Sequence, residues 1–120
     1  MNGNYSISKL LNYSIVMPDP SEQLARLYQE GFEFQTFERY PKAVGVVREQ
    51  CIALVEATPQ GLRMLGLPGW RMGEVMGVLV ESQGRKIFQA KSEALEATPE
   101  RLAKLQEFRS ALERILTPPQ

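Results

Sequence analysis

The chain's 120 residues suffice for one domain with a single core that needs no disulfide or metal to hold it. Apolar residues make up 43% and charged residues 23%, ordinary values for a globular protein that argue against disorder. The 14 basic and 14 acidic side chains cancel, so no net charge draws the chain to nucleic acid or to anionic lipid.

The first 17 residues predict an N-terminal arm rather than part of the core. Asn-Tyr-Ser-Ile occurs twice, at residues 4–7 and 12–15, and Asn, Tyr and Ser are weak helix formers. We expect an extended arm that forms an edge strand or contacts a partner, with a partly ordered tail as the alternative. Residues 18–117 are then expected to form a single α+β domain.

A short helix and a strand are expected next. Asp19 can cap the helix, Pro20 is tolerated in its first turn, and Gly31 ends it. Apolar residues at positions 24, 27 and 28 follow helical spacing. Residues 32–36 then alternate between Phe or Thr and polar side chains, which predicts a half-buried strand.

Residues 42–57 have two interpretations. Positions 44, 47, 51 and 54 fit a helix, and no proline or strong turn residue divides the segment. Four valines and one isoleucine nevertheless favour a pleated surface, and Gly45 weakens a helix. We predict two strands here, and the choice changes the strand count.

Turn residues organise the rest of the predicted sheet. Thr-Pro-Gln-Gly at 58–61 predicts a turn into a strand at 62–65, and Gly-Leu-Pro-Gly at 66–69 predicts a second break. Residues 74–81 and 85–90 then form the clearest hairpin, around Ser-Gln-Gly. The result is an antiparallel sheet of about five or six strands.

The C-terminal helix has the most regular pattern. Thr98 can cap it, Pro99 occupies its first turn, and two prolines at 118–119 end it. Its apolar stripe consists of Leu102, Leu105, Phe108, Leu112 and Ile115. A stripe this regular has to be covered, so we expect an α+β fold in which the short N-terminal helix and this long helix pack on one face of the sheet.

The sequence lacks the residue types that several kinds of catalytic and metal-binding site require. There is no histidine, which removes the usual general base and the commonest metal ligand. Cys51 is the only cysteine and lies in an apolar run, which favours a buried thiol. No glycine-rich nucleotide loop or span of ~20 apolar residues occurs. We therefore expect a cytoplasmic protein that uses no metal or cofactor and contacts no membrane.

The segment at 68–74 is the strongest candidate for a binding site. It places Trp70, Arg71 and Met72 between two glycines and ahead of Glu74, and Trp and Arg dominate binding hot spots. We expect a shaped loop, or a short strand leading into the hairpin, that binds a ligand or partner, with Tyr40 at a nearby strand end as a further member. The alternative is that Trp70 and Met72 pack at one end of the core.

Two other groups of residues are weighed against simpler roles. The aromatic rings at positions 32, 34, 37 and 40 could line a pocket, but we expect them to pack against the C-terminal helix. A mild excess of basic side chains in the middle of the chain allows weak nucleic-acid binding. These are Arg63, Arg71, Arg85, Lys86 and Lys91.

Together these observations predict a non-enzymatic module that binds a small ligand or a protein. Self-association as a homodimer is expected, because an open sheet has edges to protect. The alternative is a small enzyme that uses carboxylate and arginine chemistry, with Glu74, Arg71 and Tyr40 as the candidates. Nucleic-acid binding is the weakest of the hypotheses.

Overall fold

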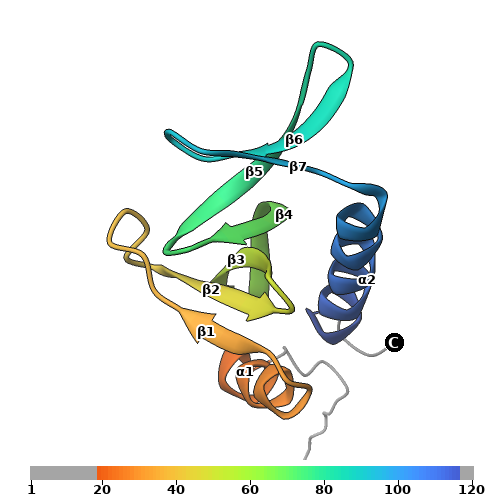
Figure 1. Cartoon of the computed structure of the whole chain (residues 1–120). Coiled ribbons are helices and arrows are strands. Elements are labelled where there is room, and N and C mark those ends of the chain that lie inside the picture. The colour runs from red at the N-terminus through yellow and green to blue at the C-terminus, as the bar shows by residue number, and fades with distance from the viewer. Residues whose placement is uncertain (1–18, 117–120) are drawn as a thin grey trace, which may run out of the picture.

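The computed structural model describes residues 19–116, so the arm predicted at residues 1–17 lies outside the described residues. Within them the elements are α1 (Pro20–Gln29), β1 (Glu33–Gln35), β2 (Ala43–Arg48), β3 (Cys51–Thr58), β4 (Gly61–Met72), β5 (Val75–Ser82), β6 (Arg85–Gln89), β7 (Ala94–Glu96) and α2 (Pro99–Leu116). The strands form one antiparallel sheet in sequence order, which curls strongly beside the two helices (Figure 1). The predicted α+β class with an antiparallel sheet is confirmed.

The sheet has seven strands rather than the five or six predicted. The additional strand is β7, which pairs with β6 through Phe88 opposite Leu95 and two flanking pairs. Three residues are too few for an alternating pattern to appear in the sequence. A strand this short forms because its neighbour is already in place.

The predicted break at residues 66–69 is wrong, because β4 runs through it. Leu65 is opposite Leu54 and Gly69 is opposite Ile52, so residues 66–68 all face the single residue Ala53. Gly66 has a positive φ of 69°. The Gly-Leu-Pro-Gly sequence therefore makes a bulge that bends the strand without ending it.

The two strands predicted in residues 42–57 are confirmed as β2 and β3. Arg48 pairs with Cys51, so Glu49 and Gln50 alone form the turn. Both turn residues have positive φ, 50° and 72°, as a type I′ turn requires. Glycine or asparagine usually fills these positions, and neither residue is present here, so the turn could not be predicted from residue type.

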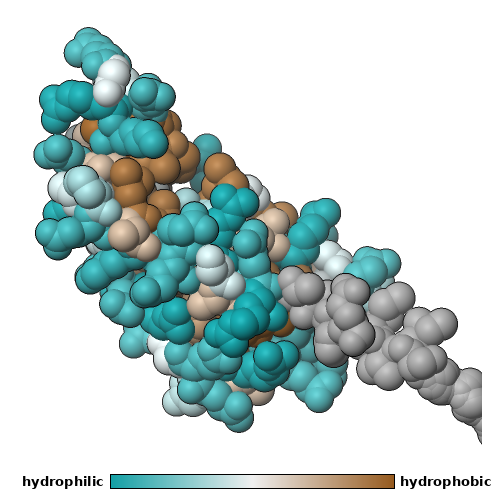
Figure 2. Space-filling model, turned by 90° about the vertical axis from the view of Figure 1, so that its right-hand side faces the viewer, coloured by the Kyte–Doolittle hydropathy of each residue, from teal (hydrophilic) through white to brown (hydrophobic). Residues whose placement is uncertain are grey.

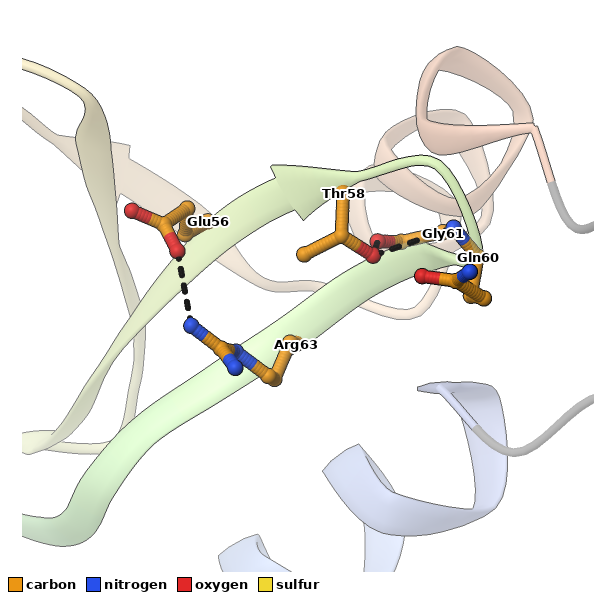
Figure 3. A network of polar contacts seen from close by, with 5 residues as sticks. All are labelled: Glu56, Thr58, Gln60, Gly61 and Arg63. Atoms are coloured by element: carbon orange, nitrogen blue, oxygen red, sulfur yellow. Dashed lines mark hydrogen bonds and ion pairs between the residues drawn. The ribbon is translucent and has the colours of Figure 1, made fainter.

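The predicted turn at 58–61 joins β3 to β4 and is held by Thr58 (Figure 3). The Thr58 hydroxyl donates to the Gly61 carbonyl at 2.7 Å and accepts from the Gln60 N–H at 3.1 Å. Two residues further along each strand, Arg63 forms an ion pair with Glu56 at 3.0 Å. These contacts fix the hairpin register next to the turn.

Both predicted helices form with their predicted caps. The Asp19 carboxylate accepts from the Ser21 N–H at 2.9 Å, and the Thr98 hydroxyl accepts from the Arg101 N–H at 3.2 Å. The buried side chains of α2 are Leu105, Phe108, Leu112 and Ile115. Neither helix in residues 19–116 is long and apolar enough to cross a membrane.

One buried polar side chain, that of Gln23, ties the two helices to the sheet. Its Oε1 accepts from the Leu62 N–H of β4 at 2.7 Å, and its Nε2 donates to the Leu116 carbonyl of α2 at 3.4 Å. The buried core is one continuous cluster that extends from Leu27 of α1 to Phe88 of β6. The β5–β6 hairpin projects from the upper end of the molecule (Figure 1).

Candidate functional site

The sheet divides where β4 and β5 separate. Only three residue pairs join these strands, from Trp70 opposite Gly77 to Met72 opposite Val75. Beyond them β5 pairs with β6 alone, from Val78 to Ser82. The projecting hairpin therefore diverges from β4 (Figure 1). An open groove of about 1100 Å³ lies among β4, β5, β6 and α2.

The groove is lined mainly by apolar side chains. The bulge of β4 contributes Leu67 and Pro68, and β5 contributes Val75, Met76 and Val78. Leu67 is 67% exposed and Val78 is 55% exposed. In Figure 2, which views the molecule from the α2 side, hydrophobic surface gathers below the hydrophilic upper end. Concentrated exposed apolar surface is typical of interaction sites.

The far wall of the groove comes from α2 and the loop between β1 and β2. Leu102 and Leu105 project from α2, and Phe37 and Tyr40 belong to the loop. The prediction that the aromatic rings at positions 32, 34, 37 and 40 pack against the C-terminal helix is therefore confirmed only in part. Phe32 is buried, and its ring centroid lies 5.7 Å from that of Phe108 on α2, whereas Phe37 and Tyr40 line the groove.

Cations outnumber carboxylates around the groove. Four basic residues line it (Arg39, Lys86, Lys91 and Arg109), against the single carboxylate of Glu38. Arg109 is engaged with Glu113 at 3.2 Å. Within residues 19–116, the other three cations have no ion-pair partner. The site is thus apolar with a positive margin.

The five residues predicted as a site occupy different places. Trp70 is buried in β4 with its ring stacked on Phe88, 5.4 Å between centroids. Arg71 and Met72 are half-buried at the end of the same strand, and Glu74 is exposed in the following turn. Of the two alternatives for this segment, a loop or a short strand, the structure shows mostly strand, because Pro68 and Gly69 bend β4 without ending it. Of the five, Tyr40 alone lines the groove.

The residues considered for the two alternative functions, an enzyme and a nucleic-acid binder, are only partly on the groove. Of the three residues considered for an enzyme, Tyr40 lines the groove and Glu74 and Arg71 do not. Of the five basic residues considered for nucleic acid, Lys86 and Lys91 line the groove and Arg63 is paired with Glu56. Residues 19–116 hold no cluster of three or more Cys, Asp or Glu side chains that could bind a metal.

Cys51 does not supply a nucleophile at neutral pH. Its side chain is buried in β3, and this burial, with the nearby Glu49 carboxylate, raises the pKa of the thiol to about 11. The thiolate is the reactive form of cysteine, and it is scarce several pH units below the pKa. Cys51 therefore acts as a small core side chain, as its apolar surroundings predicted.

Little in the sequence pointed to the groove. Its lining residues come from six separate parts of the chain, 37–40, 54, 65–68, 75–79, 86–91 and 102–109, and no motif joins them. One signal was available: Leu67 lies between Gly66 and Pro68, in a segment that turns away from regular pairing. An apolar side chain on such a segment often remains exposed.

Comparison with known proteins gives no family to which this groove can be referred. No protein-family model, no characterised protein and no solved structure matches the chain. The function is therefore argued from the groove itself.

Proposed function

We propose that this protein is a non-enzymatic binding module whose ligand occupies the groove between the β5–β6 hairpin, the bulge of β4 and α2. The observation that carries the proposal is the apolar lining, with Leu67 and Val78 more than half exposed. Ligand sites are typically concave and mostly apolar, with volumes of about 300–1,000 Å³. The groove, at about 1100 Å³, is slightly larger than that range.

Replacing Leu67 by asparagine should weaken the binding of a neutral apolar dye, Nile red, by roughly tenfold, since a buried leucine contributes about 1.5–3 kcal/mol. The side chain is largely exposed, so the thermal unfolding temperature should hardly change. The measurement is a fluorescence titration of the full-length protein. Tyr28→Asn is the matched control, because Tyr28 is 72% exposed on α1 and does not line the groove. Equal losses in both variants, or no dye binding at all, would count against the proposal.

We also propose self-association, through the projecting hairpin rather than the sheet edges. The end strands β1 and β7 have three residues each, and short edge strands limit edge-to-edge pairing. Val80 of β5 is exposed and does not line the groove, so a second copy could cover it and leave the ligand site open.

Replacing Val80 by lysine should raise the dissociation constant of the dimer by roughly tenfold, because a two-fold interface loses the apolar side chain twice. Sedimentation equilibrium over a concentration series measures this constant. Phe34→Ser, on the edge strand β1, should leave it unchanged. A wild-type protein that stays monomeric at the highest concentration would remove the self-association proposal and leave the groove proposal intact.

A further inference from the structure

The positive margin of the groove carries a more specific inference, which rests on the proposed ligand-binding function. We infer that the ligand is a free amphipathic anion: a long unbranched hydrocarbon chain that ends in a single carboxylate. The chain would lie on the apolar floor, and the carboxylate would meet the cations at the margin.

The charge arrangement supports an acidic head group. Arg39, Lys86 and Lys91 come from two separate parts of the fold, the β1–β2 loop and the β6 region, yet all line the same groove. Lys86 is opposite Glu81 across the β5–β6 ladder, but no ion pair joins them. Unpaired cations beside apolar surface attract an anion and disfavour a cation. Glu38, at the same groove, is the one opposing charge.

The lining supports a ligand with one polar end. Among the described residues, its uncharged hydrogen-bonding side chains are Tyr40, Gln89 and Gln106. A ligand with polar groups along its whole length would leave most of them without partners, which is costly. The volume, about 1100 Å³, favours a lipid-sized chain over a small acid.

The chain's own N-terminal segment is a poor match for this groove. Residues 1–17 contain Lys9 and no Asp or Glu, so they add positive charge where the groove is already positive. A free fatty-acid-like anion matches both the floor and the margin. A second copy of the chain and an anionic membrane surface are the other occupants that an experiment has to separate.

The test is isothermal titration of the full-length protein, at neutral pH and low salt, with decanoate, dodecanoate and tetradecanoate. Affinity should rise by roughly tenfold for each two added methylenes, because burial of each contributes about 0.8 kcal/mol. Dodecanoate should bind roughly tenfold more tightly than dodecanol, and dodecylammonium should bind most weakly. Each exposed cation changes the affinity by up to about fivefold, so Lys86 and Lys91 together can account for the tenfold preference.

A paired substitution locates the head group. The double variant Lys86→Gln/Lys91→Gln should bring the affinities for dodecanoate and dodecanol together and leave dodecanol binding unchanged. Arg85→Gln is the matched control, because Arg85 is the exposed neighbour of Lys86 on β6 but does not line the groove. It should preserve the preference for the acid.

The outcomes distinguish this inference from the function on which it rests. Equal binding of dodecanoate and dodecanol by the wild type would overturn the anionic ligand and leave an apolar binding module. Failure of these compounds and of Nile red to bind would overturn both. Binding to phosphatidylglycerol vesicles without binding to free dodecanoate would overturn the inference in favour of a membrane surface. Dodecanoate binding that disappears when the protein dimerises would overturn it in favour of a second copy.

Discussion

Replacing Phe88 by alanine should lower the free energy of unfolding by about 3–5 kcal/mol, the usual cost of removing a buried phenylalanine ring. Phe88 is 0% exposed, and its ring stacks on Trp70 of β4. It also sits opposite Leu79 of β5 and Leu95 of β7. One ring therefore joins the projecting hairpin to the main body of the sheet. Loss of that ring should loosen the hairpin and not only open a cavity.

Urea unfolding followed by circular dichroism measures this loss. Trp70, the only tryptophan, provides a second readout, because its emission should shift to longer wavelength once its stacking partner is gone. Val78→Ala on the same hairpin is the control, since Val78 is more than half exposed and should change stability by less than about 1 kcal/mol. A loss at Phe88 no larger than this control would show that the ring does not anchor the hairpin.

Gly69→Ala should destabilise the protein by about 3 kcal/mol, the upper end of the cost of overpacking. A Cβ at residue 69 would collide with the backbone carbonyl oxygen of Gly77 on β5 and would lie 3.3 Å from the Met76 methyl group. Backbone atoms cannot swing aside as the end of a side chain can. The three residue pairs between β4 and β5 would have to separate, and the groove that begins there would lose its shape.

The matched control is Gly73→Ala, in the turn between the same two strands. Gly73 has a positive φ of 68° and nothing within 4 Å of an added Cβ, so its cost is conformational, about 1 kcal/mol. Unfolding curves of the two variants separate steric collision from backbone strain. Gly69→Ala should also abolish Nile red binding, whereas Gly73→Ala should retain it. Equal stability of the two variants would contradict the close approach of β4 and β5.

The sequence predicted those elements whose signals are local. Asp19 and Thr98 cap their helices through side chains that act within three residues, and the Gln83-Gly84 turn has positive φ at both residues. The turn at Glu49 and Gln50 could not be predicted from the sequence. Pairing of the flanking strands, rather than the type of the turn residues, holds both at positive φ. The strand β7 likewise depends on β6.

The groove could not be predicted for a related reason. It exists because β4 and β5 part after three residue pairs, and this separation is a property of the curled sheet rather than of any one segment. Trp70 illustrates the difficulty: its residue type suggested a binding loop, whereas its strand position turns the ring onto Phe88. Tyr40 was singled out through its place near a strand end and as one of four aromatic rings that could line a pocket, and the other groove residues carry no motif.

The strict sequence order of the strands has a consequence for how the chain reaches this structure. Four of the six strand connections are two-residue turns, so these pairings close short loops and can begin as soon as two adjacent strands exist. The last element, α2, covers β3, β4 and α1, and it leaves the ribosome only after the whole sheet. A growing chain therefore carries a paired sheet with an uncovered apolar face until its final eighteen helical residues emerge. Synthesis, rather than the finished fold, is the stage at which this protein is most exposed to aggregation.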